Sequence, residues 1–200
     1  MKKRSLVNIA RYYGYQRIII TLETEKEGFT MLSKEVAALL NEQINKEFYS
    51  AYLYLDISNY YNDKNLNGFS NWFKVQAQEE RDHAMLFLTY LHNNNEKVTL
   101  TSIAGPDKSF ADFKAPLAAA LEHEIFVTAS INNIYEEAAK QKDFRTQQFL
   151  NWFIDEQGEE EKNAQELIDR FELFGTDARG LYLLDAELGA RTYTAPSLVL

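Results

Sequence analysis

The sequence predicts an all-α fold in which four long helices pack as a bundle. The chain has only 3 Pro and 8 Gly in 200 residues, so few residues interrupt long helices. From Leu32 onward, apolar side chains recur in steps of three and four, which is the spacing of one helix face. Hydrophobic residues make up 46% of the chain, which is enough for one domain with a sizeable core.

The first two helices are expected to form an antiparallel pair. The first opens at Ser33, a good N-cap, with Glu35 in its first turn, and "NDKNLNG" ends it. "HNNN" ends the second helix. The inward stripe of the first helix is Leu40, Ile44, Glu47, Ala51, Tyr54 and Ser58, and that of the second is Phe69, Phe73, Gln76, Glu80, His83, Phe87 and Leu91. The short turn between them favours antiparallel packing.

The third and fourth helices form a second such pair, separated by "KQKD". The third begins between Ser109 and Pro116. Ser109 with Asp112 is one candidate start, as a capping box, and Pro116 as a first-turn residue is the other. The two stripes are Leu117, Leu121, Glu124, Thr128, Ile131 and Tyr135, then Leu150, Phe153, Gln157, Glu160, Ala164, Leu167 and Phe171.

Two connections complete the predicted topology. The segment from about 93 to 110 has no helical period, so it must cross the length of the bundle between helices two and three. The fourth helix is expected to stop before Gly175, a fitting residue just past a helix end. A short fifth helix is expected around 180–188.

All four apolar stripes contain polar side chains that can bind metal, near the middle of each helix. These are Glu47, Glu80 with His83, Glu124, and Gln157 with Glu160. A single inward Glu is more often a rim residue, and a lone inward His is more often a hydrogen-bonded core residue. Four helices that place such groups at matching depth bring carboxylates together, and these repel one another unless cations neutralise them.

The ligand types indicate which metal the cluster would hold. Carboxylate oxygens dominate, with one imidazole and no thiolate, which favours iron or manganese over copper or structural zinc. Two ions bridged by one carboxylate use the ligands economically, and Glu80 is the natural bridge. The net charge of −9 also favours cations, and it disfavours nucleic acid and anionic membranes as partners.

Four segments carry a family resemblance: "LNEQINKEFYSAYLY", "AQEERDHAMLFLTYL", "LEHEIFVTASINNI" and "FLNWFIDEQGEEEKNAQELI". From Met31 to about Leu188 the chain closely resembles a bacterial non-heme ferritin. The resemblance implies a ferritin-like bundle that assembles into a homo-oligomeric, twenty-four-subunit cage. It also implies oxidation of Fe(II) with oxygen or hydrogen peroxide, and storage of the product as a ferric mineral.

The resemblance also implies roles for single residues. Glu47, Glu80 and His83 match ligands of a first iron, and Glu124 and Gln157, sharing Glu80, match ligands of a second. The carboxylates that match a third site are Glu79, Glu156, Glu159 and Glu160. Tyr54 matches a tyrosine suited to electron donation and is the catalytic candidate, while Trp152 matches a nearby aromatic that is equally good core filler.

Departures from related patterns bear on the cofactor. Heme-containing bacterioferritins have a Met heme ligand after the bridging Glu, where this chain has Arg81. Their fourth helix carries Glu-x-x-His, where this chain has Gln157 and Glu160. Both differences speak against heme. The tail "GARTYTAPSLVL" does not match the family pattern, which leaves its role open.

Residues 1–30 differ from the rest of the chain. "MKKR" and "IIITL" imitate the start of a signal peptide, but the apolar core is short and Glu23 follows it. "EKEGFTM" can be encoded with AAGGAGG, a bacterial ribosome-binding sequence, shortly before Met31. We therefore expect a translated leader or irregular arm over 1–30, a di-iron domain over 31–190 and a tail over 191–200.

Other classes of protein share parts of this pattern. The alternative enzyme is a small di-iron oxidase or peroxidase of the rubrerythrin type without mineral storage, although the absence of Cys removes the rubredoxin part of that class. A structural or signalling bundle needs no inward carboxylates. No apolar run approaches the roughly 20 residues of a membrane span, and the chain has no Cys for disulfides, so the cytoplasm is the expected compartment.

Overall fold

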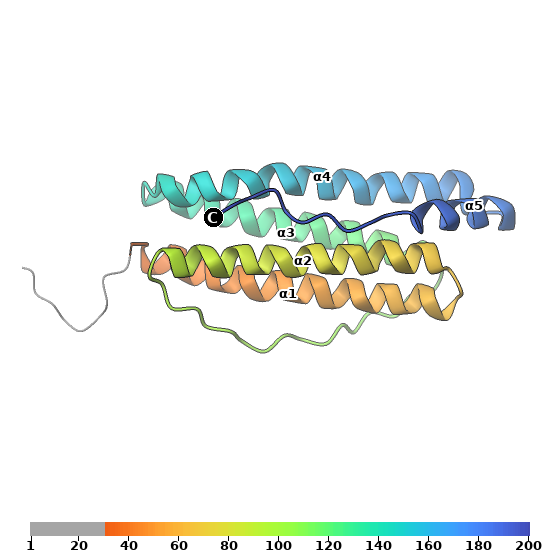
Figure 1. Ribbon diagram of the computed structural model, residues 1–200, viewed down its shortest axis with the longest axis horizontal. Coiled ribbons are helices and arrows are strands. Elements are labelled where there is room, and N and C mark those ends of the chain that lie inside the picture. Colours follow the sequence, from red (N-terminus) through yellow and green to blue (C-terminus); the bar gives the residue numbers. More distant parts are fainter. Residues whose placement is uncertain (1–30) are drawn as a thin grey trace, which may run out of the picture.

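A computed structural model describes residues 31–200 of the chain; the expected leader or arm, 1–30, lies outside them. The described part contains five helices: α1 (Lys34–Asp63), α2 (Asn67–Asn93), α3 (Ala115–Lys140), α4 (Phe144–Phe174) and α5 (Ala178–Leu188) (Figure 1). At about 1.5 Å per residue, the four long helices run on the order of 40 Å. The predicted all-α bundle with a short fifth helix is therefore confirmed. Over residues 31–200, no helix is long and apolar enough to cross a membrane.

The helices pack as two close pairs, α1 with α2 and α3 with α4, and α1 also packs on α3. The backbones of α2 and α4 stay farther apart, with no Cα pair within 8 Å. The predicted crossover runs along the bundle beside α1, so that α2 and α3 point in the same direction (Figure 1). The side chain of Asn41 on α1 anchors this crossover, because Asn41 Oδ1 accepts a hydrogen bond from the backbone N–H of Thr99 at 2.7 Å.

The helix ends explain where each element begins. Ser33 caps α1 as predicted, since its Oγ accepts from the N–H of Val36 at 3.2 Å. At the start of α3 the capping box is wrong and Pro116 lies in the first turn, as the alternative expected. Asp112 Oδ1 instead accepts from the N–H groups of Lys114 and Ala115, both at 2.9 Å. The helix α4 ends at Phe174, before Gly175, as predicted.

Three chain reversals depend on a left-handed backbone just after a helix. Asn65, Asn95 and Lys142 have φ of 60°, 57° and 55°. Asparagine tolerates this conformation better than most residues, whereas for Lys142 it costs about 1–2 kcal/mol. Asn65 and Lys142 lie in the turns after α1 and α3, where they allow the chain to reverse within a few residues.

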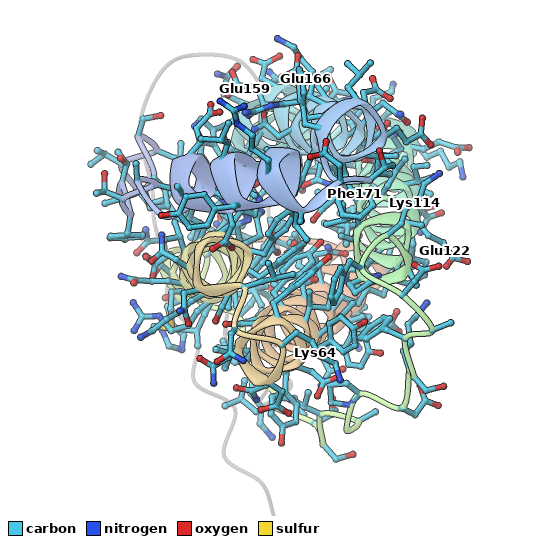
Figure 2. The ribbon with its side chains drawn as sticks, turned by 90° about the vertical axis from the view of Figure 1, so that its right-hand side faces the viewer. Lys64, Lys114, Glu122, Glu159, Glu166 and Phe171 are labelled. Atoms are coloured by element: carbon cyan, nitrogen blue, oxygen red, sulfur yellow. The ribbon has the colours of Figure 1, made fainter. Side chains whose placement is uncertain are left out.

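The core consists of two apolar clusters with a polar layer between them. One cluster includes Leu40, Ile44, Phe87, Leu91 and Phe153, and the other includes Leu53, Ile57, Phe69, Phe73 and Leu167. The view along the bundle shows side chains filling the space between the four helices (Figure 2). Each large apolar side chain buried there contributes about 1.5–3 kcal/mol. The two clusters therefore stabilise a bundle whose middle is charged.

Candidate metal centre

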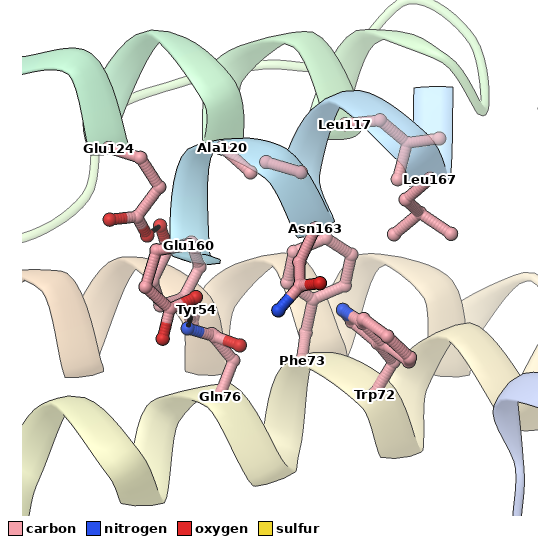
Figure 3. Close-up of a pocket in the computed structure, with 11 residues that line it drawn as sticks. Tyr54, Trp72, Phe73, Gln76, Leu117, Ala120, Glu124, Glu160, Asn163 and Leu167 are labelled. Atoms are coloured by element: carbon pink, nitrogen blue, oxygen red, sulfur yellow. Dashed lines mark hydrogen bonds between the residues drawn. The ribbon is translucent and has the colours of Figure 1, made fainter. Parts of the chain in front are cut away.

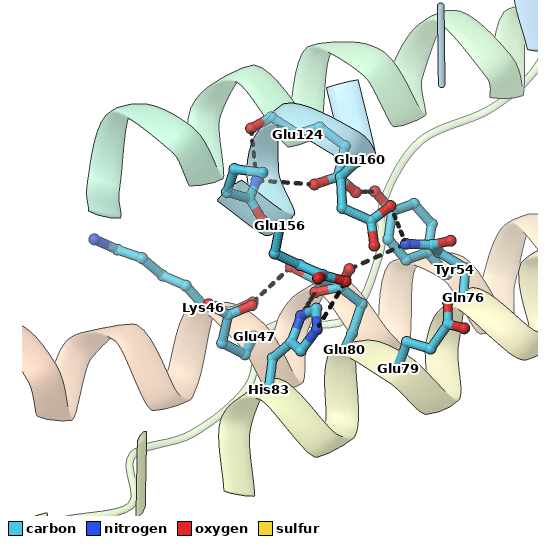
Figure 4. Close-up of polar contacts among 12 residues, drawn as sticks. Lys46, Glu47, Tyr54, Gln76, Glu79, Glu80, His83, Glu124, Glu156 and Glu160 are labelled. Atoms are coloured by element: carbon cyan, nitrogen blue, oxygen red, sulfur yellow. Dashed lines mark hydrogen bonds and ion pairs between the residues drawn. The ribbon is translucent and has the colours of Figure 1, made fainter. Parts of the chain in front are cut away.

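All four long helices contribute to the polar layer, as the sequence predicts. Its members are Glu47, Glu80, His83, Glu124, Gln157 and Glu160. The most exposed member, Glu160, retains only 7% of its accessible surface. The side chains converge between the helices (Figure 4). Carboxylates are almost never buried this deeply without compensation, so the layer requires a specific explanation.

Glu47, Glu80 and His83 form the first side of the layer. Each offers a ligand atom, and these atoms lie within 4.8 Å of one another. Gln43 Nε2 donates to Glu47 Oε1 at 2.8 Å, but Glu47 Oε2 is buried without any hydrogen-bond partner. Since buried acceptors are nearly always paired, this oxygen marks a position suited to a cation.

Glu124, Gln157 and Glu160 form the second side, where donors already satisfy the carboxylates. The Tyr54 hydroxyl donates to Glu124 Oε1, and Gln157 Nε2 donates to Glu124 Oε2 at 3.2 Å. Gln76 Nε2 donates to Glu160 Oε2 at 2.7 Å. Gln157 thus presents its amide nitrogen to its neighbour, and its oxygen must turn toward an ion before it can be a ligand.

The electrostatics of the layer favour protons or cations. Burial first, and then the charge of Glu80, raise the pKa of both Glu47 and Glu124 to about 8. The pKa values of Glu80 and Glu160 are also raised, by burial first and then by Glu160 and Glu124, respectively. The metal-free layer therefore holds protons near neutral pH. A divalent cation that takes their place restores the carboxylates to their ionised form.

The carboxylates predicted for a third site are dispersed in this structure. Glu156 Oε1 lies 3.9 Å from His83 Nε2, at the margin of the layer. Glu79 forms an ion pair with Arg191 at 2.5 Å. Glu159 is exposed on α4 (Figure 2). Burial is the main cause that raises the pKa of Glu156, and the charge of Glu159 raises it further. Only Glu160 is itself inside the layer.

The two aromatic candidates lie beside the layer. Tyr54 is fully buried with its hydroxyl on Glu124, and burial raises its pKa well above the usual range. The Trp152 ring is 5.5 Å from the His83 ring in an edge-to-face arrangement. A small pocket reaches the second side, with Phe73 and Leu167 on its apolar wall and Glu160 on its polar wall (Figure 3).

Two glutamines support the ligands, and neither is among the residues that the sequence predicts to bind metal. Gln43 positions Glu47, and its Oε1 accepts from Ser130 Oγ at 2.6 Å, which in turn accepts from Lys46 Nζ at 2.7 Å. Gln76 lies in the predicted inward stripe of the second helix, and an inward amide beside carboxylates is the signal that identifies it. Gln43 lies one helical turn before Glu47, and that spacing was a second signal.

Together the fold and the layer define a four-helix bundle with a buried, carboxylate-rich candidate metal site. The sequence profile of the ferritin-like domain matches residues 37–174, and the chain belongs to the ferritin family. It is 41% identical over 155 residues to the bacterial non-heme ferritin of Campylobacter jejuni, covering 78% of this chain and 93% of that protein. It is 38% identical to that of Staphylococcus epidermidis over 163 residues, covering 82% and 98%.

Solved structures show the same relationship. An open-pore ferritin from the hyperthermophilic archaeon Archaeoglobus fulgidus superposes with a TM-score of 0.79 at 40% identity, covering 80% of this chain and 99% of that one. A closed form of that ferritin, engineered by site-directed mutagenesis, gives 0.80, covering 82% and 99%. The expected resemblance to a bacterial non-heme ferritin is thereby confirmed.

Proposed function

We propose that this protein stores iron and that the polar layer is a di-iron ferroxidase centre with Fe(II) as its substrate. The observation that carries the proposal is the unpaired, buried oxygen of Glu47 beside Glu80 and His83. Oxygen ligands with one imidazole suit Fe(II) and Fe(III). Membership in the ferritin family supports the same metal.

In the proposed reaction, Fe(II) displaces the protons that the metal-free layer holds. One ion binds on the first side, and a second binds between Glu80 and Glu124 on the second side. Two Fe(II) ions together supply two electrons. These reduce dioxygen with two protons to hydrogen peroxide, or reduce hydrogen peroxide with two protons to two water molecules. Ionised carboxylates in a low-dielectric site favour Fe(III) over Fe(II), because the more highly charged ion gains more from them.

Two further residues have proposed roles at the second side. The Tyr54 hydroxyl donates a hydrogen bond to Glu124, and we assign Tyr54 the role of an electron donor. Gln157 is a neutral ligand, and an amide oxygen attracts Fe(III) less strongly than a carboxylate does. The second ion is therefore released more readily, toward Glu160 and the marginal carboxylates Glu156 and Glu79. We place Glu159 at the far end of this path, and no heme takes part.

Exposed apolar residues support assembly into a homo-oligomer. Leu173 and Tyr182 are each 72% exposed, and Phe174 and Leu183 lie close by at 51% and 57%. Apolar patches of this kind mark protein–protein contacts. We propose that copies of the chain form a twenty-four-subunit cage that encloses the mineral in the cytoplasm.

Aerobic Fe(II) titration, followed at near-ultraviolet wavelengths with particle sizing on the same sample, tests this function. We expect fast oxidation of two Fe(II) per chain, further turnover into a mineral, and a particle far larger than a dimer. Fast oxidation by a small particle without mineral would instead indicate an enzyme of the rubrerythrin type. Oxidation no faster than in buffer alone would overturn the ferroxidase assignment.

A further inference from the structure

The C-terminal segment 190–200, here called the strap, folds back over the seam between α2 and α4 (Figure 1). The Tyr193 hydroxyl donates to Asp82 on α2, and Trp152 Nε1 on α4 donates to Ser197 Oγ at 3.0 Å. Leu198 packs against the apolar cluster at the start of α1. Because the backbones of α2 and α4 are farther apart than those of the close pairs, the strap covers the most open seam of the bundle.

Arg191 is the most heavily bonded residue of the strap. Its guanidinium donates to Glu79 Oε2 at 2.5 Å and to Gln76 Oε1 at 2.9 Å. It also donates to the backbone carbonyl of Trp72 at 3.2 Å and lies over the Trp72 ring, 4.2 Å from its centre. The side chains of Arg191 and Glu79 are each only 17% exposed. A planar guanidinium held at this many points is a fixed cation.

Gln76 connects this cation to the polar layer. Its Oε1 accepts from Arg191, so its Nε2 faces inward, where it donates to Glu160 at 2.7 Å and to Glu80 at 3.4 Å. Arg191 thus sets the orientation of an amide that contacts both sides of the layer. It also neutralises Glu79, a carboxylate on the proposed path of departing iron.

We propose that Arg191 competes with a divalent cation for Glu79. It holds Glu79 and Gln76 while the path is empty, and it leaves with the strap when a metal ion takes Glu79. This inference rests on the proposed function for the identity of the ion as iron, although the competition itself applies to any divalent cation. Thermodynamic linkage makes the competition reciprocal. Metal bound at Glu79 weakens the docking of the strap by the same factor by which Arg191 weakens metal binding at Glu79.

Zinc binding to the full-length protein measures the competition without redox chemistry. We expect Arg191→Gln to raise the affinity for the zinc ion that depends on Glu79 by about tenfold. The reason is that the charge-assisted bond from Arg191 no longer competes for Glu79. Glu79→Gln should remove that ion, and the double variant should bind it no better than Glu79→Gln alone. Arg191→Lys, which keeps the charge with fewer contacts, should give an intermediate affinity.

Two matched variants separate competition from a purely structural role. Arg170→Gln breaks another Arg–Glu pair, with Glu187 on α5, and should leave zinc affinity unchanged. Tyr193→Phe removes one hydrogen bond of the strap and keeps the charge beside Glu79, so by the same linkage it should tighten zinc binding, but by much less than Arg191→Gln does. If Tyr193→Phe and Arg191→Gln tighten zinc equally, the strap acts as a cover and the proposal for Arg191 is wrong.

Fluorescence gives an independent readout, because the strap contacts both tryptophans of the chain. In a Trp152→Phe background, zinc should shift the emission of Trp72 to longer wavelength as Arg191 leaves its ring. The shift should be absent when Glu79→Gln is added. Unchanged zinc affinity in Arg191→Gln together with an unshifted Trp72 emission would overturn the competition. If the wild-type protein still oxidises Fe(II) rapidly in that case, the proposed function stands while this inference fails.

Discussion

The two sides of the polar layer differ in how their carboxylates are satisfied. On the first side, Glu47 has one oxygen without any donor, and its ligand atoms lie close to those of Glu80 and His83. On the second side, Tyr54 and Gln157 both donate to Glu124. One side is arranged for a cation, and the other is closed by hydrogen bonds that a cation must disrupt.

This difference predicts the order in which the centre fills. A cation on the first side gains an unpaired buried acceptor at little cost to existing bonds. A cation on the second side must displace a tyrosine proton and turn the amide of Gln157. The first side should therefore bind earlier and more tightly, and the second side should exchange.

The largest expected effect is on the pH dependence of stability in the metal-free protein. The pKa of Glu47 rises from 4.5 to about 8 on folding, so the unfolded chain loses that proton first as the pH increases. The contribution of Glu47 to stability is therefore fully present below about pH 4.5 and is lost as the pH rises through about 8, a loss of about 5 kcal/mol for one such group. Denaturant unfolding with a chelator at pH 5.5 and 8.5 measures this.

Substitutions on the two sides sharpen that comparison. Glu47→Gln should stabilise the metal-free protein at pH 8.5, because it removes an unpaired charge. Glu124→Gln should stabilise it less, because it disturbs the bonds from Tyr54 and Gln157. Equal effects of the two variants would contradict the asymmetry, and stability that is independent of pH in the wild-type protein would contradict the raised pKa values.

Removing ligands of the first side should abolish fast oxidation of Fe(II). We expect the double variant Glu80→Gln/His83→Asn to oxidise Fe(II) at least about a hundredfold more slowly, because ligand loss affects both ions through the shared Glu80. Helicity by circular dichroism and particle size should be unchanged. Glu122→Gln/His92→Asn, which makes the same exchange at exposed positions, serves as the control. Wild-type initial rates in the first double variant would exclude Glu80 and His83 as ligands.

A charged ligand on the second side should retain its ion. Gln157→Glu is expected to raise the affinity for a metal ion on the second side by about tenfold. Later turnovers should therefore be slower, while the first turnover remains fast. Multi-turnover stopped-flow oxidation shows this, and Gln148→Glu on the exposed face of α4 is the control. Equal later rates in wild type and Gln157→Glu would mean that the charge of the ligand does not govern release.

The smallest expected effect is at Tyr54. Replacement by Phe removes the donor to Glu124 and keeps the ring in its cluster. Oxidation should slow by about threefold to tenfold, consistent with loss of one positioning hydrogen bond and a nearby electron source. Single-turnover stopped-flow measurements follow this directly. A fall as large as that of the Glu80/His83 double variant would mean that Tyr54 is itself indispensable.

Periodicity predicted which residues face inward, because a helix face repeats every three to four positions regardless of what the side chains bind. It could not predict that Gln157 presents its nitrogen to Glu124, since an amide's orientation depends on its neighbours. It also gave no signal for Arg191, which reaches Glu79 only because an aperiodic segment folds back along α2. At α3, Ser109 and Pro116 both satisfied local rules, and Pro116, held in the first turn, was correct.

Graded zinc loading of crystals, followed by anomalous diffraction, tests the central claim most directly. At one zinc per chain, we predict a peak among Glu47, Glu80 and His83. A second peak, between Glu80 and Glu124, should appear only at higher loading. A first peak beside Glu124, or no peak inside the polar layer at any loading, would contradict a metal centre that fills from its first side.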